Sequence, residues 1–79
     1  MVLVYLNNGE CIEVQDAVRV AVEDDLVVCY DRLGRITATF PARQVETYTA
    51  NEDVAEQLKE DICEDLTVLG EEGAPEELV

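Results

Sequence analysis

Residues 18–40 read VRVAVEDDLVVCYDRLGRITATF, and this stretch decides the fold. Apolar and polar residues alternate on either side of two turn signals, at residues 24–25 and 33–34, which is the pattern of half-buried strands joined by hairpins. Pairing the three strands across these turns puts one set of side chains on a common inner face. That face comprises Val18, Val20, Val22, Val27, Cys29, Ala38 and Phe40.

The N-terminal residues predict a further hairpin. An apolar run at residues 2–6 ends at Asn8-Gly9, a strong signal for a two-residue hairpin loop. With that loop, Leu3 and Tyr5 share a face with Ile12 and Val14. Residues 10–23 then alternate around Gln15-Asp16, which fits one long bent strand or two strands joined by a bulge.

Pro41 ends the strand that precedes it, because proline cannot donate to a ladder. Residues 41–44 are expected to form a single helical turn, followed by a last short strand at residues 45–49. Five strands in meander order, with a helical turn before the last, resemble the small Sm-like and Src-homology-3-like barrels over residues 2–49. The resemblance implies a recognition or assembly module. The aromatic groove typical of the family is not evident in this sequence.

A helix is predicted at residues 52–67. Asn51 is a strong N-cap candidate, and Glu52 and Asp53 suit the positive end of the helix dipole. Gly70 is expected to end the helix. An apolar stripe should cover one open end or face of the barrel, and it comprises Val54, Ala55, Leu58, Ile62, Leu66 and Leu69.

The predicted fold is therefore mainly β (α+β): a small antiparallel five-stranded sheet or barrel with one C-terminal amphipathic acidic helix. Residues 1–69 are expected to form a single domain, with strands at 2–49, and residues 70–79 an acidic disordered tail. The predicted core includes Val20, Val27, Cys29, Phe40 and Leu58.

The charge is unevenly distributed. The chain carries a net charge of −14, of which residues 52–79, with eleven acids and one lysine, contribute −10. Glu52, Glu56, Glu60 and Glu64 follow one another at four-residue steps, where like charges oppose the helix by a few tenths of a kcal/mol per pair. Such a field attracts basic partners and repels nucleic acid and anionic membranes. An acid-rich proteome or a merely solvated surface would also give this composition.

No catalytic constellation appears. The sequence contains neither histidine nor serine, so a Ser-His or Cys-His pair cannot be built, and the glycines stand apart. We expect no enzyme activity, no cofactor and no metal. Cys11, Cys29 and Cys63 are widely spaced and odd in number, which argues against zinc and against a disulfide framework. They fit a reducing cytosol, and no apolar run is long enough to span a membrane.

The acidic segment predicts a binding role instead. Seven acids between Glu52 and Asp65 would lie along roughly 20 Å of helix, or about one charge per 3 Å, close to the roughly 3.4 Å per phosphate of a DNA strand. In size and charge the chain resembles the acidic DNA-mimic inhibitors of phages and mobile elements, among them anti-CRISPR and anti-restriction proteins. The resemblance implies that the chain blocks a Lys/Arg-lined nucleic-acid-binding site on a partner protein.

The predicted partner-binding residues form two groups. The helix contributes Glu52, Asp53, Glu56, Glu60, Asp61 and Glu64, and a possible second patch comprises Glu23, Asp24 and Asp25. Two alternatives stay open: a host protein–protein interaction or assembly module whose acids only keep it soluble, and an antitoxin-like neutraliser of a basic partner.

Overall fold

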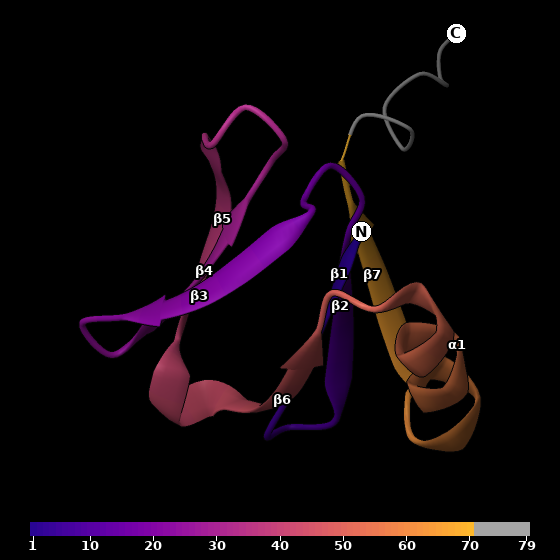
Figure 1. Ribbon diagram of the computed structural model, residues 1–79. Helices are drawn as coiled ribbons and strands as arrows, with labels where there is room; N and C mark the ends of the chain where they lie inside the picture. Colours follow the sequence, from indigo (N-terminus) through magenta and orange to yellow (C-terminus); the bar gives the residue numbers. More distant parts are fainter. Residues whose placement is uncertain (71–79) are drawn as a thin grey trace, which may run out of the picture.

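The computed structural model of the chain describes residues 1–70 (Figure 1). It is mainly β-structure with one α-helix: β1 (Val2–Leu6), β2 (Glu10–Val14), β3 (Arg19–Glu23), β4 (Leu26–Tyr30), β5 (Ile36–Pro41), a 3-10 turn η1 (Ala42–Gln44), β6 (Val45–Thr49), α1 (Glu52–Asp61) and β7 (Asp65–Leu69). One sheet has the strand order β6-β1-β2-β7, and the second has the order β3-β4-β5.

The hairpins of the three-stranded sheet confirm the predicted registers. Val20 pairs with Cys29, and Cys29 with Ala38. The β3–β4 turn consists of Asp24 and Asp25, both in the left-handed region with φ of 50° and 65°, a conformation that aspartate tolerates better than most residues. The inner face is buried at its centre only. Val27 and Cys29 are buried, Val20, Ala38 and Phe40 are half-buried, and Val18 and Val22 are exposed.

The β1–β2 hairpin differs from the prediction by one residue. Its loop has three residues, 7–9, and Gly9 has a φ of +95° and donates its backbone N–H to the carbonyl of Leu6. Val4 consequently pairs with Ile12, and Leu3 pairs with Glu13. A shift of one residue exchanges the two faces of a strand, so the predicted grouping of Leu3 and Tyr5 with Ile12 and Val14 is wrong.

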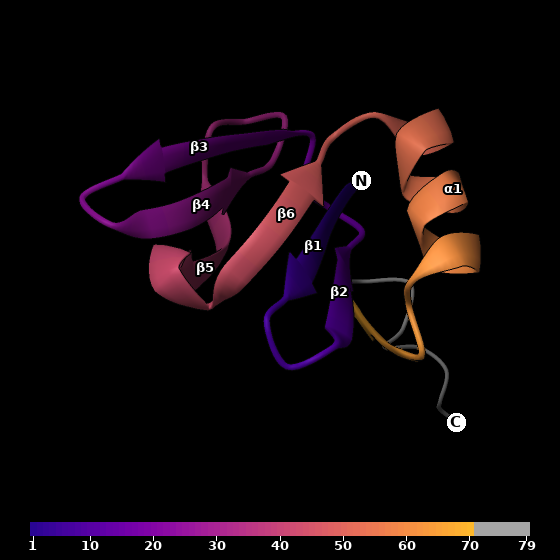
Figure 2. The same cartoon turned by 90° about the horizontal axis from the view of Figure 1, so that it is seen from below.

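The elements form three layers, with the four-stranded sheet in the middle (Figures 1 and 2). The three-stranded sheet packs on one of its faces and α1 on the other. The core between the sheets contains Val2, Val4, Ile12, Val14, Ala17 and Cys29. A smaller cluster of Leu3, Cys11 and Ala55 lies beneath the helix, flanked by half-buried residues that include Leu58.

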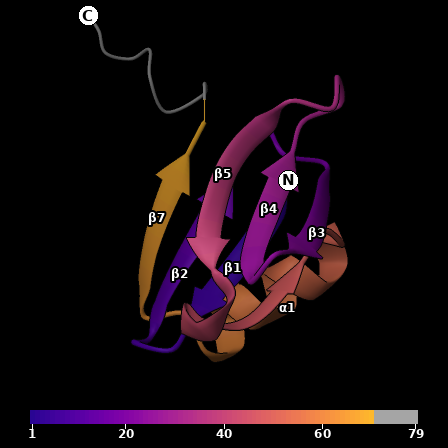
Figure 3. The same cartoon turned by 90° about the vertical axis from the view of Figure 1, so that its left-hand side faces the viewer.

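The prediction of a mainly β fold with one helix is confirmed, but the predicted five-stranded sheet or barrel is wrong in two respects. Residues 1–70 form seven strands, and the two sheets do not close into a barrel (Figure 3). The stretch at residues 10–23, which we expected to be one bent strand or a bulged pair, instead changes sheets at residues 15–18. β2 therefore belongs to the first sheet and β3 to the second, whereas the helical turn before β6 is confirmed.

The helix is shorter than predicted. It ends at Asp61 rather than at residue 67, and residues 65–69 form β7, which pairs in parallel with β2. This segment is rich in residues that favour strands, and the open edge of β2 supplies its backbone partners. Leu66 and Leu69 are therefore exposed strand residues rather than part of a helical stripe. Gly70 follows a strand rather than a helix. The rest of the predicted tail, residues 71–79, lies outside the described residues.

Within residues 1–70, no helix is long and apolar enough to cross a membrane.

The cluster beneath the helix can be tested through its most buried leucine. Leu3 is 0% exposed, whereas Leu33 in the β4–β5 turn is 69% exposed. Leu3→Ala should lower the free energy of unfolding by about 2–5 kcal/mol, because it leaves a cavity. Leu33→Ala, the matched control, should change it by less than about 0.5 kcal/mol. Urea denaturation measures both, and equal effects of the two substitutions would contradict the burial of Leu3.

Candidate functional site

Helix α1 begins where the sequence predicts. Oδ1 of Asn51 accepts hydrogen bonds from the backbone N–H groups of Asp53, at 2.8 Å, and Val54, at 3.1 Å. Two of the otherwise unpaired N–H groups of the first turn are thereby satisfied. Glu52 and Asp53 occupy this turn, where the helix dipole favours negative charge. The acids at the start of α1 are thus compatible with the helix they belong to.

The acidic side chains of α1 point away from the sheet. Ala55 is fully buried, and Leu58 and Lys59 are half-buried, which fixes the inward side of the helix. The remaining charged positions are exposed. We call them the acidic helix face, and they are Glu52, Asp53, Glu56, Glu60 and Asp61. Five of the six helix-patch residues predicted from sequence therefore share one element. Glu64, the sixth, is exposed but lies in the turn between α1 and β7.

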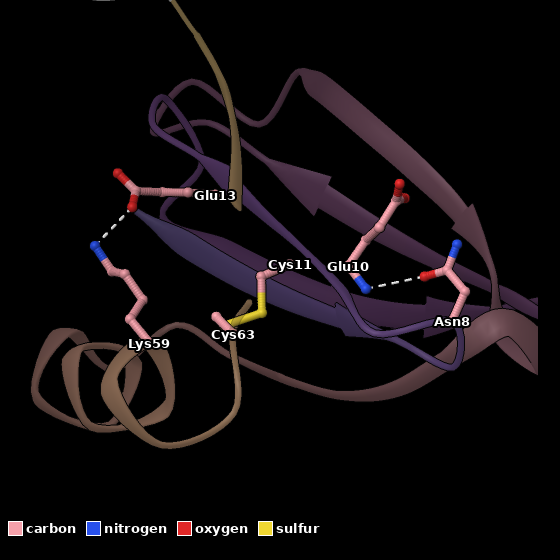
Figure 4. The surroundings of a disulfide bond; sticks show 6 residues. All are labelled: Asn8, Glu10, Cys11, Glu13, Lys59 and Cys63. Carbon is pink, nitrogen blue, oxygen red and sulfur yellow. Dashed lines mark hydrogen bonds and ion pairs between the residues drawn. A yellow bond between two sulfur atoms is a disulfide. The ribbon is translucent and has the colours of Figure 1, made fainter. Parts of the chain in front are cut away.

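A disulfide and an ion pair tie α1 to β2 (Figure 4). Cys11 on β2 is bonded to Cys63, which follows the helix. Lys59 on α1 donates to Oε1 of Glu13 on β2 at 2.7 Å. Because strand residues alternate between faces, Cys11 and Glu13 share one face of β2, the face that their partners Cys63 and Lys59 approach. The disulfide and the ion pair therefore hold the helix region to the same face of β2.

The prediction that the cysteines do not form a disulfide is therefore wrong. The parallel pairing of β7 with β2 sets Leu66 opposite Cys11. This pairing brings the segment just before β7, which contains Cys63, close to Cys11, although 52 residues separate the two cysteines in sequence. The spacing of the cysteines along the sequence does not indicate that these two lie close together in the fold. In the chain-entropy description, closing a loop of that length contributes roughly 4 kcal/mol of stability. Since a stable disulfide is typical of oxidising compartments, the cysteines no longer support the predicted reducing cytosol.

The Lys59–Glu13 ion pair is largely shielded from water. The side chain of Glu13 is 8% exposed and that of Lys59 is 23% exposed. The hydrogen bond to Glu13 raises the pKa of Lys59, and a second contact with Oε2 of Glu56 at 3.3 Å adds to this effect against the opposing effect of burial. Neither Lys59 nor Glu13 is among the site residues predicted from the sequence. The available signal was an acid at an inward-facing strand position.

The possible second acidic patch is not part of this face. Glu23, Asp24 and Asp25 lie at the β3–β4 turn, at the opposite end of the molecule from α1 in both Figure 1 and Figure 2. Glu23 accepts a hydrogen bond from the Tyr30 hydroxyl at 2.7 Å. The two groups of acids that the sequence predicts therefore lie in separate regions of the molecule.

The arginines are concentrated around the second sheet. Arg19 lies over the ring of Tyr30, 4.1 Å from its centroid. Arg35 pairs with Asp31 at 2.9 Å, and backbone N–H groups of the same turn, that of Arg35 first, lower the pKa of Asp31. Two of the four arginines thus have partners within the second sheet and its turns, and among the ion pairs of residues 1–70 only Lys59 offsets the negative charge of α1.

The described residues form an open cleft near the start of α1 and contain no cluster of metal ligands. No group of three or more histidine, cysteine or acidic side chains in residues 1–70 could hold a metal ion. An open cleft of about 590 Å³ runs between the β4–β5 turn and the start of α1, and its lining mixes Asp16, Asp31 and Glu52 with Arg32 and Arg35. This mixed charge gives the cleft no clear preference for an anion or a cation.

No known protein family, curated protein or solved structure matches this chain significantly.

The two contacts of Lys59 allow a matched test of the ion pair. A double-mutant cycle with Lys59→Met and Glu13→Gln should give a coupling free energy of about 1–3 kcal/mol, because the pair is shielded from water. The corresponding cycle with Glu56→Gln, whose carboxylate is exposed, should give less than about 0.5 kcal/mol. Denaturant unfolding supplies the four free energies of each cycle. Equal couplings would show that Glu13 is as well solvated as Glu56.

The raised pKa of Lys59 also predicts a pH dependence. The folded state binds this proton more tightly than the unfolded state, so the stabilisation is fully present below the ordinary lysine pKa of 10.5 and is lost as the pH rises through the raised value. Unfolding free energies measured from pH 9 to 12 should fall more steeply for the parent than for Lys59→Met. Parallel curves would contradict the assignment.

Proposed function

We propose that the protein binds the Lys/Arg-lined nucleic-acid-binding surface of a partner protein and blocks it, in the manner of a DNA-mimic inhibitor. The acidic helix face carries the proposal. Its five exposed carboxylates lie along ten residues, or about 15 Å of helix. That is one charge per about 3 Å, close to the spacing of phosphates along one DNA strand of about 3.4 Å.

The attachment of α1 to the sheet also supports the proposed inhibitor function. A flexible acidic segment would lose conformational entropy on binding, whereas a helix already fixed to a sheet loses little. The disulfide at Cys63 and the Lys59–Glu13 pair hold α1 by its inward side. The outward carboxylates are therefore presented in one arrangement before any partner arrives.

The charge distribution supports a directed approach to a basic surface. Residues 52–65 carry seven acids and one lysine, whereas residues 19–41 carry four acids and three arginines. The field is thus strongest around α1 and the turn that follows it. An uneven field of this kind orients a basic partner towards one end of the molecule and speeds its association.

A host interaction module is the second candidate, favoured by one observation. β7 forms an edge of the four-stranded sheet in the described chain, and its Leu66, Val68 and Leu69 are each more than 40% exposed. Apolar edge strands pair readily with segments of other proteins. An antitoxin-like role uses the same acidic helix face as the inhibitor and differs only in the identity of the basic partner.

Charge reversal tests the proposed function. The partner is first captured from an extract of the native host, and its DNA is then displaced with this protein. Glu60→Lys/Asp61→Lys should weaken binding to that partner at least about tenfold, since each reversal turns an attraction of up to about 1 kcal/mol into repulsion. The fold should persist, because cations are favourable in the last turn of a helix and neither residue contacts Lys59.

The matched control carries the same change of charge elsewhere. Glu10→Lys/Glu46→Lys alters two exposed acids on β2 and β6 and should reduce binding much less than the helix variant. Added salt should also weaken binding by the parent steeply. If the helix variant binds like the parent, and salt has little effect, the acidic helix face is a solvated surface and docking through β7 becomes the better account.

A further inference from the structure

The Cys11–Cys63 disulfide connects β2 of the four-stranded sheet to the segment that follows α1. Cys11 is 0% exposed on β2, whereas Cys63, between α1 and β7, is partly exposed. Figure 4 shows the bond between the helix and the sheet, on the same side of β2 as the Glu13–Lys59 pair. Both sulfur-bearing residues belong to the small cluster under the helix, and neither belongs to the larger core between the sheets.

Apart from the disulfide, few apolar contacts hold α1 in place. Ala55 is its only fully buried residue, and the other helix residue in the cluster, Leu58, is half-buried. A helix of ten residues is shorter than the roughly 12–15 that isolated helices need to be even marginally stable in water. The helicity of residues 52–61 therefore depends on docking, and the docking depends largely on the disulfide and on the contact of Lys59 with Glu13.

We infer that the Cys11–Cys63 disulfide is a redox-controlled latch on the acidic helix. In the oxidised protein the bond holds α1 against β2. Once it is reduced, α1 opens locally while the two sheets stay packed, because the core between the sheets contains no residue of the helix. The consequence for binding rests on the proposed function: the carboxylates keep their fixed spacing only while the latch is closed.

A dithiol reductant supplies the chemistry. Its thiolate attacks Sγ of Cys63, the more exposed sulfur-bearing residue, and the S–S bond breaks with Cys11 leaving as a thiolate that takes up a proton. The second thiol then attacks the reductant sulfur of the mixed disulfide and releases Cys63. The reductant becomes a disulfide, and the protein gains two electrons and two protons. Cys29 takes no part, because it is buried in the other core, where desolvation raises its pKa.

Hydrogen exchange tests the latch on the full chain without a partner. Backbone amides of residues 52–61 should exchange in dithiothreitol at nearly the rate of an unstructured peptide. Those of β4 should stay protected at least about tenfold, although loss of the loop constraint lowers their protection as well. Unchanged exchange in α1 would overturn the inference. Loss of protection in β4 as well would also overturn it, since the bond would then support the whole fold.

A disulfide-free variant supplies the control. Cys11→Ala/Cys63→Ala should show fast exchange in α1 with and without dithiothreitol, while β4 keeps its protection. A dithiothreitol effect that persists in this variant would show that the reagent acts elsewhere. Because no partner is present, the outcome is separate from the charge-reversal experiment: the latch can fail with binding intact, and binding can prove independent of the acidic helix face with the latch intact.

Discussion

The register of the β1–β2 hairpin is the constraint on which the rest of the structure depends. A three-residue loop that ends at Gly9 sets Val4 opposite Ile12 and Leu3 opposite Glu13. The first pair then faces the second sheet, and the second pair faces the helix. With a loop one residue shorter, β2 would turn Ile12 towards α1 and bring Glu13 into the core between the sheets. The ion pair and the disulfide to the helix would both be lost.

Local signals predicted the parts of the fold whose partners are close in sequence. The two turns of the β3–β4–β5 sheet gave the right registers, because each joins neighbouring strands through a short loop. The N-terminal hairpin was misplaced because Asn8-Gly9 also fits the end of a three-residue loop, in which Gly9 alone takes the positive φ. Local pattern cannot separate these two loops when both neighbouring strands are apolar on either face.

The C-terminal third was harder to predict because its partner lies far away in sequence. Leu66 and Leu69 fit a helical stripe as well as a strand, and only the open edge of β2 decides in favour of the strand. The same pairing brings Cys63 to Cys11. Five of the acids on the helix could be predicted from the sequence, since their spacing and the Asn51 cap are local. Glu13 and the disulfide that position them could not, because they depend on the register of the β1–β2 hairpin and on contacts between segments far apart in sequence.

β2 thus takes part both in the apolar core between the sheets and in the attachment of the acidic helix. One face of β2 contributes Ile12 and Val14 to the core, and the other holds the helix through Cys11 and Glu13. Cross-strand nuclear Overhauser effects between β1 and β2 test this arrangement most directly. Contacts that join Val4 to Ile12 and Leu3 to Glu13 are the expected result. Contacts that join Tyr5 to Ile12 and Leu3 to Val14 would place the strands one residue apart from this register and contradict the account.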